Sequence, residues 1–149
     1  MKIKLISLFF ILVLTLSACG GASEFQRNQD RWEEQNVNHY RFTLVVGCFC
    51  PFAGAEVTYE VLNGQVVSES VKPASDRPDD PTRISEFYQP YNTIDKVFDY
   101  VEGAISEADK TTVEYDSTYG FPTNVTVDLI EMAMDDEMYL TLSNFEALP

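Results

Sequence analysis

Residues 39–46 read HYRFTLVV, an alternation of polar and apolar side chains that decides the class of fold. Successive side chains of a β-strand point to opposite faces, so this alternation predicts a strand with one buried face. The same parity reaches Cys48 and Cys50, although Gly47 and Pro51 are expected to bend or end the strand. The buried face is expected to carry Tyr40, Phe42, Leu44 and Val46.

The residues that follow predict a hairpin. Residues 55–62 alternate again and place Val57, Tyr59 and Val61 on one face. Asn63-Gly64 then supplies two residues that tolerate positive φ, which is the strongest short signal for a hairpin turn. Residues 65–71 form the return strand, so the first half of the chain is expected to hold a three-strand antiparallel meander.

Two helices are expected, one before each group of strands. The first spans residues 24–36, is capped by Ser23 and docks through Trp32. The second follows Asn92 as its N-cap, because apolar side chains then recur at helical spacing. These side chains are Ile94, Val97, Phe98, Val101, Ile105 and Ala108.

Three more strands are expected at residues 111–116, 123–129 and 138–145. The order of elements is therefore helix, three-strand meander, helix, three-strand meander. This order predicts an α+β fold in which the helices pack on one face of an antiparallel sheet. Residues 25–149 are a suitable length for one such domain.

Residues 72–92 are expected to form a long loop, because they hold four prolines and an acidic pair. A connection of this length inside a small domain is usually functional or mobile. We therefore interpret it as a candidate partner-binding loop. Its candidate contact residues are Asp79, Asp80, Phe87, Tyr88 and Tyr91.

The first 18 residues have the pattern of an export signal. Lys2 and Lys4 precede an apolar run over residues 5–16, which is shorter than the ~20 residues needed to cross a bilayer. The run ends in Leu16-Ser17-Ala18-Cys19, which resembles the lipobox of bacterial lipoproteins. That resemblance implies cleavage before Cys19, a diacylglycerol on its thiol and a palmitate-type acyl chain on the new amino group.

Two or three acyl chains give stable membrane anchoring. Residues 19–24 are expected to be the lipidated tether, and the bilayer is the first expected partner. Gly20 rather than aspartate follows the cysteine, and this favours the periplasmic side of the outer membrane if the source is Gram-negative. The alternative, an ordinary secretory signal with a chance cysteine, stays open.

The charge excludes one large class of partner. The net charge is −14, and removal of Lys2 and Lys4 with the signal peptide makes it −16. Proteins that bind nucleic acid neutralise phosphates with lysine and arginine, so we expect no nucleic-acid partner. The same charge is expected to keep the domain soluble and off an anionic bilayer, and the alternative, a cationic partner, stays open.

Cys48-Phe49-Cys50 is the main candidate for chemistry. With Cys19 lipidated, an even pair of cysteines remains in an oxidising compartment. A disulfide across one residue closes a tight, strained ring, and strain makes such a bond labile. Three states stay open: a disulfide, two reduced thiols, or a redox or soft-metal site of the kind that binds Cu(I).

The chain lacks the motifs of a nucleophilic hydrolase or a phosphate-binding loop. His39 is its single histidine and is expected at a strand start rather than on a metal. We therefore expect no catalytic residues, no metal site and no cofactor. The leading interpretation is a non-enzymatic binding module of the bacterial cell envelope, whose partner is an unknown envelope protein or ligand. The alternative is a thiol-based redox or metal-binding protein that uses Cys48 and Cys50.

Three sequence features together resemble a family of small bacterial lipoproteins known only as a domain of unknown function. The most specific feature is YDSTYGFPT at residues 115–123. The others are Cys48-Phe49-Cys50 and the closing residues Asp136-Glu137 and Ser143-Asn144-Phe145. The resemblance supports a lipoprotein and implies no activity.

Overall fold

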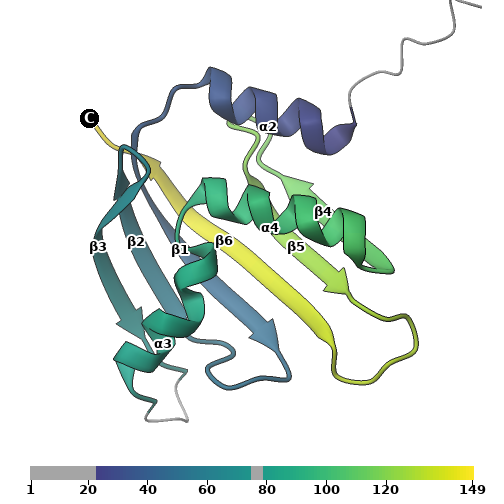
Figure 1. Ribbon diagram of the computed structural model, residues 1–149. Helices are drawn as coiled ribbons and strands as arrows, with labels where there is room; N and C mark the ends of the chain where they lie inside the picture. Colours follow the sequence, from purple (N-terminus) through teal and green to yellow (C-terminus); the bar gives the residue numbers. More distant parts are fainter. Residues whose placement is uncertain (1–22, 75–78) are drawn as a thin grey trace, which may run out of the picture.

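The computed structural model describes residues 23–74 and 79–149 (Figure 1). The expected signal peptide at residues 1–18 and the lipidation site Cys19 lie outside the described residues. Within the described residues, no helix is both long enough and apolar enough to span a bilayer.

One antiparallel sheet carries the fold, and its six strands lie in the order β3-β2-β1-β6-β5-β4. The helices are α2 (Glu24–Glu34), α3 (Pro81–Tyr88) and α4 (Ile94–Glu107), with a 3-10 turn η1 (Gln89–Tyr91) between α3 and α4. The strands are β1 (His39–Cys48), β2 (Glu56–Leu62), β3 (Gln65–Lys72), β4 (Lys110–Tyr115), β5 (Pro122–Asp128) and β6 (Glu137–Ala147). The α+β class and the two meanders are confirmed.

β1 lies in the middle of the sheet. It pairs with β2 on one side and with β6 on the other. The β2–β3 turn has positive φ at both Asn63 (50°) and Gly64 (73°), as an Asn-Gly hairpin requires. The four side chains expected on the buried face of β1 are all at most 2% exposed: Tyr40, Phe42, Leu44 and Val46.

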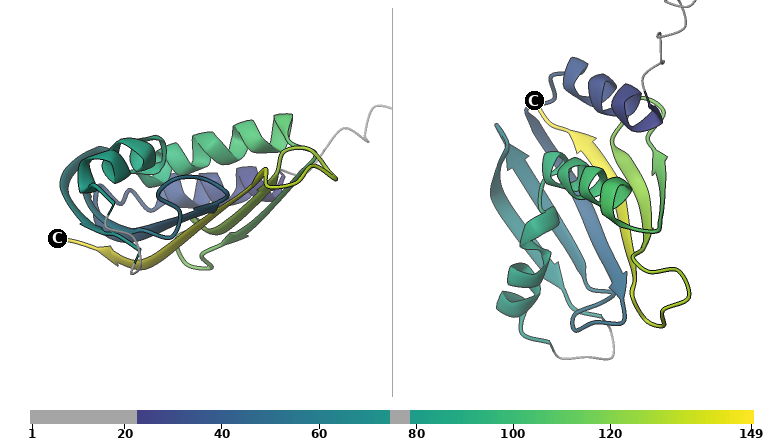
Figure 2. Two further views of the ribbon diagram at one scale, coloured as in Figure 1. Left: turned by 90° about the horizontal axis from the view of Figure 1, so that it is seen from below. Right: turned by 45° about the vertical axis from the view of Figure 1, so that its right-hand side comes forward.

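The helices cover one face of the sheet and the core lies between the two layers (Figure 2). α4 buries an apolar stripe as predicted, and α2 docks through Trp32. The indole N–H of Trp32 donates to the Asp95 carboxylate at 3.0 Å and so joins α2 to the first turn of α4. The opposite face of the sheet is polar, and there the hydroxyls of Thr43 and Thr58 lie 3.0 Å apart on neighbouring strands.

The expectation of a long loop over residues 72–92 is wrong. Most of this segment forms α3 and η1. The Asp80 carboxylate accepts from the backbone N–H of Thr82, so Asp80 caps α3, and Pro81 occupies the first turn. Proline at this position has a suitable φ and lacks an N–H that would have no helical partner. The prolines therefore start a helix here instead of preventing one.

Three smaller expectations also fail. Thr93 rather than Asn92 caps α4, because the Thr93 hydroxyl accepts from the backbone of Lys96. Ile105, expected on the buried stripe, is 51% exposed near the end of the helix. Leu129, expected to point inward, is 46% exposed because β5 ends at Asp128.

Candidate functional site

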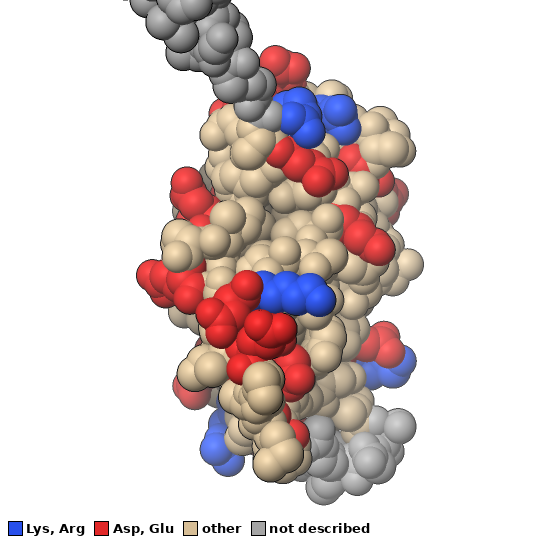
Figure 3. Space-filling view, turned by 90° about the vertical axis from the view of Figure 1, so that its right-hand side faces the viewer, with Lys and Arg blue, Asp and Glu red and all other residues tan. Residues whose placement is uncertain are grey.

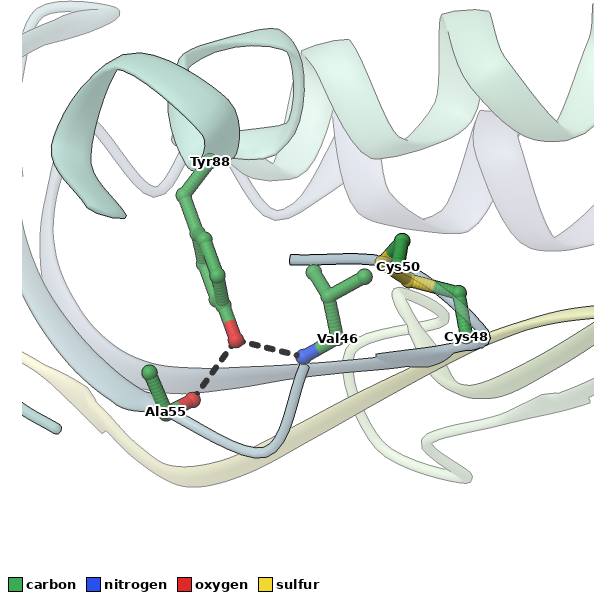
Figure 4. Close-up of a disulfide and its surroundings, with 5 residues drawn as sticks. All are labelled: Val46, Cys48, Cys50, Ala55 and Tyr88. Carbon is green, nitrogen blue, oxygen red and sulfur yellow. Dashed lines mark hydrogen bonds between the residues drawn. A yellow bond between two sulfur atoms is a disulfide. The ribbon is translucent and has the colours of Figure 1, made fainter. Parts of the chain in front are cut away.

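A buried tyrosine fixes the loop between β1 and β2, residues 49–55. The Tyr88 hydroxyl donates to the Ala55 carbonyl at 2.7 Å and accepts from the Val46 N–H at 3.0 Å (Figure 4). The Val46 carbonyl in turn accepts from the Gly54 N–H at 2.8 Å. The loop is therefore held at both ends, and α3 supplies the side chain that holds it.

Cys48 and Cys50 are joined as a disulfide at the start of this loop (Figure 4). Their Cα atoms lie 5.1 Å apart, inside the range that a disulfide requires and closer than in an extended strand. β1 ends at Cys48, so the bend that was expected at this point is present. Phe49 stands between the two cysteines and is 81% exposed.

The loop between β5 and β6, residues 129–136, exposes more apolar side chains. Ile130 is 62% exposed, Met132 95% and Met134 89%. Two carboxylates hold the loop backbone: Asp136 accepts from the Ile130 N–H and Asp109 accepts from the Glu131 N–H, each at 2.8 Å. The loop thus presents apolar side chains on a hydrogen-bonded backbone.

Both loops leave the same end of the sheet. Cys48, the last residue of β1, lies opposite Met138, the second residue of β6. Figure 1 shows the two loops at the lower end, while α2 begins at the upper end. We call the exposed apolar side chains of these loops the apolar tip: Phe49, Leu129, Ile130, Met132 and Met134.

Acidic side chains lie beside the apolar tip. Figure 3 shows them gathered on the side of the molecule that holds β4, β5 and the β5–β6 loop. The strand register puts Asp128 between Lys110 and Glu137. No group of three or more acidic, histidine or cysteine side chains in residues 23–74 and 79–149 could hold a metal ion.

His39 lies at the far end of β1 from the cysteine pair. Its Nδ1 is 2.9 Å from the Pro149 oxygen and its Nε2 is 3.1 Å from the Glu60 carboxylate. The Pro149 hydrogen bond first, and Glu60 second, raise the pKa of His39 above 6.5. Arg41 also pairs with Glu60 at 3.0 Å and, more than His39, lowers the pKa of Glu60.

The five residues expected to contact a partner do not form one exposed surface. Tyr88 is fully buried, and Asp80 caps a helix. Phe87 packs on Phe52, and Tyr91 packs on Tyr100. Asp79 is half-buried just before α3.

The apolar tip is not among the sites predicted from the sequence. Residues 129–134 read LIEMAM, a mostly apolar run that lacks the spacing of a strand or a helix, and this run indicates the tip. Such a run between a strand and an acidic turn is a candidate exposed loop rather than part of the core.

The YDSTYGFPT motif forms the turn that joins β4 to β5. The Asp116 carboxylate accepts from the N–H groups of Thr118 and Tyr119, and the Asp116 N–H donates to the Phe121 carbonyl. Gly120 has φ +85° and lies so close to α2 that a Cβ would stand 2.5 Å from the Asn28 carbonyl oxygen. Asp116 and Gly120 thus each have a structural role in this turn.

The ring of Phe121 joins an aromatic cluster below α2. Its centroid lies 4.6 Å from that of Phe145 and 6.0 Å from that of Trp32. The motif therefore anchors α2 and belongs to the fold rather than to a reactive site.

No curated protein and no solved structure matches the chain. A family model of unknown function (DUF6174) matches residues 24–147, which include every described helix and strand. This match confirms the expected kind of family, while the lipobox and a bacterial source stay predictions. The chain belongs to the family of unknown function DUF6174.

Proposed function

We propose that this protein is a lipid-anchored module of the bacterial cell envelope that binds another envelope protein through its apolar tip and catalyses no reaction in doing so. The observation that carries the proposal is the apolar tip itself. Single exposed apolar residues are normal on soluble domains, but a group of them at one end is typical of an interaction surface.

The placement of the tip supports the proposal. The described chain starts at α2, and the tip lies at the opposite end of the sheet (Figure 1). A domain tethered through Cys19 would therefore direct the tip away from its own bilayer. A partner in the surrounding compartment could reach it there.

The composition of the tip also supports binding. Met132 and Met134 have flexible, polarisable side chains that adapt to the shape of a partner. Phe49 adds a large rigid ring, the kind of side chain that contributes strongly to interfaces. The backbone beneath Ile130 and Glu131 is already hydrogen-bonded, so binding orders little more of the chain.

The charge beside the tip specifies the chemistry of the partner. Asp135 and Asp136 belong to the same loop as the methionines, and Glu137 begins β6. We expect a partner surface with an apolar centre and basic residues at its rim. Opposite charges would speed the encounter, and this effect would weaken with added salt.

The anchoring half of the proposal is tested by Cys19→Ser. The variant should carry no acyl chains and keep its signal peptide uncleaved at that site, and intact mass measures both changes. Unchanged processing would remove the lipoprotein assignment.

The binding half is tested by copurification of a double variant, Met132→Ser with Met134→Ser. The matched control is Val67→Ser with Ile105→Ser, which also removes two exposed apolar side chains, 54% and 51% exposed, but away from the tip. A partner recovered with the wild type and the control, and lost with the tip variant, supports the proposal. Equal recovery with both variants contradicts it.

A separate arm distinguishes a lipid surface from a protein. A chain of residues 23–149, which lacks the signal peptide and Cys19, should not float with vesicles of phosphatidylethanolamine and phosphatidylglycerol, since anionic lipid repels the acidic domain. Flotation that depends on Met132 and Met134 would assign the tip to a membrane instead.

A further inference from the structure

The Cys48–Cys50 bridge lies where another molecule can reach it. It follows the end of β1 and neighbours Phe49, whose ring is 81% exposed. Cys48, Phe49 and Cys50 line a shallow surface hollow of about 400 Å³ together with Pro51 and Ala53. An extended peptide could therefore place a thiol against the bridge and an apolar side chain against Phe49.

The loop does not need the bridge to hold its shape. Tyr88 bonds to the backbone on both sides of the loop, at Val46 and at Ala55 (Figure 4). These bonds come from a buried side chain of α3 and involve neither sulfur. Reduction would therefore leave the two cysteines close together, and closely held thiols re-form a disulfide readily.

The bridge also contributes little to the stability of the fold. The stabilisation that a disulfide gives grows with the length of chain it closes, and this one spans a sequence separation of two. The apolar core between the sheet and the helices holds the fold elsewhere. Both cysteines are half-buried at the surface, and bridges that solvent can reach are more readily reduced than buried ones.

We infer that Cys48 and Cys50 form a thiol–disulfide exchange site whose substrates are dithiols in extended segments of other proteins. This inference does not rest on the proposed binding role of the apolar tip. It assigns the transfer of two electrons to the Cys48–Cys50 pair.

The exchange proceeds in two attacks. A substrate thiolate attacks one sulfur of the bridge, forms a mixed disulfide with it and releases the other cysteine as a thiolate. The second substrate thiolate then attacks the substrate's sulfur in the mixed disulfide. The substrate leaves as a disulfide, its two electrons reduce the pair, and its two thiol protons end on Cys48 and Cys50.

Two features complete the chemistry. Return to the bridged form uses a second disulfide, from a protein or from glutathione, which accepts the same two electrons. The attacking thiolate comes from the substrate, because His39 stands at the other end of β1 and cannot act as the base. The rate should therefore rise with pH as the substrate thiol ionises.

The test uses the purified full-length chain in its folded, oxidised state. The probes are reduced glutathione in large excess and a reduced synthetic peptide with two cysteines and an apolar residue between them. Thiol labelling and intact mass should show both cysteines reduced while circular dichroism shows the native fold. A bridge that opens only in denaturant is a structural staple, and that result overturns the inference.

Single variants trap the intermediate. Cys48→Ser or Cys50→Ser, mixed with the oxidised form of the same peptide, should accumulate a mixed disulfide several-fold above the reduced wild type, whose second thiol resolves it. A free-thiol reagent should label the remaining cysteine of each single variant. If that cysteine is labelled but neither variant forms the mixed disulfide, the pair does not exchange with peptides, and the inference is wrong.

Phe49→Ala tests the substrate contact separately. It should slow exchange with the peptide several-fold and leave exchange with glutathione unchanged, because glutathione lacks an apolar side chain. Equal slowing of both probes would mean that Phe49 acts on the bridge and not on the substrate.

Discussion

The phenolic oxygen of Tyr88 lies 3.0 Å from the backbone nitrogen of Val46, and this bond connects α3 to the centre of the sheet. The same oxygen donates to the Ala55 carbonyl at 2.7 Å. One hydroxyl thus satisfies two backbone groups that would otherwise be buried without partners. Burial is also the main reason that the pKa of Tyr88 is raised, so the hydroxyl stays protonated and able to donate.

Tyr88→Phe should therefore cost more than one ordinary hydrogen bond. We expect the free energy of unfolding to fall by about 2 to 4 kcal/mol, because a buried N–H and a buried carbonyl lose their partner together. The urea unfolding midpoint measures this change.

The control is Tyr91→Phe. The Tyr91 hydroxyl makes no hydrogen bond within the described parts of the chain, while its ring packs on Tyr100 with centroids 5.0 Å apart. We expect a change below about 0.5 kcal/mol there. Equal effects at the two tyrosines would mean that the Tyr88 hydroxyl does not hold the loop.

Gly120→Ala should be among the most damaging small substitutions. A methyl group at this position would stand 2.5 Å from the Asn28 carbonyl oxygen, and the φ of +85° disfavours any side chain. The expected loss is about 2 to 4 kcal/mol of unfolding free energy, from overpacking and backbone strain together. Chemical denaturation measures it.

Gly103→Ala is the matched control for Gly120. Gly103 lies inside α4, and a Cβ there would meet nothing within 4 Å. Alanine should stabilise the helix by about 0.5 to 1 kcal/mol. Stabilisation at both glycines would show that the β4–β5 turn does not press against α2.

The strands could be predicted from the sequence, and helix α3 could not. A strand with one buried face alternates apolar and polar side chains, and this alternation can be recognised in the sequence. β1 and the Asn63-Gly64 hairpin are therefore predicted at nearly their observed positions. In α3 the relevant pattern was also present, since Ile84 and Tyr88 are one helical turn apart and both fully buried. Asp80-Pro81 is also a suitable helix start, but the four prolines of the segment led to the prediction of a loop.

The candidate site depends on contacts that no local pattern encodes. Leu129 continues the inward parity of β5, but β5 ends one residue earlier at the Asp128–Glu137 pair. Beyond that pair no strand or helix covers the loop, so its apolar residues face water. The neighbouring position of the Phe49 loop follows from the pairing of β1 with β6, two strands far apart in the sequence.

Removal of the disulfide should have a small effect on stability. Cys48→Ser with Cys50→Ser is expected to lower the unfolding free energy by no more than about 2 kcal/mol, because the closed loop is so short. Leu44→Ala, which empties a fully buried position of β1, should cost about 2 to 5 kcal/mol. If the cysteine variant is the more damaging of the two, the bridge is a structural requirement.

His39 should titrate above its ordinary pKa of 6.5. A pKa that folding raises means that the protonated form stabilises the fold. This contribution is complete below the unfolded pKa and is lost as the pH rises through the folded pKa. The stability deficit of His39→Gln should therefore be largest in acid and shrink above neutral pH.

An NMR titration of the imidazole measures this pKa directly. Glu60→Gln should lower the pKa only in part, because the hydrogen bond to Pro149 is the larger cause. A wild-type pKa at or below 6.5 would show that neither hydrogen bond persists in solution.

The binding role of the apolar tip is tested most directly by a photo-crosslinking residue placed at Met132 in the full-length chain in living cells. A second chain with the same residue at Ile105, half exposed on α4, is the control. We predict that illumination joins Met132 to one defined envelope protein, that added salt weakens this product in isolated envelopes, and that the control gives none of it. The same adduct from both positions, or an adduct from Ile105 alone, would contradict a binding surface at the tip.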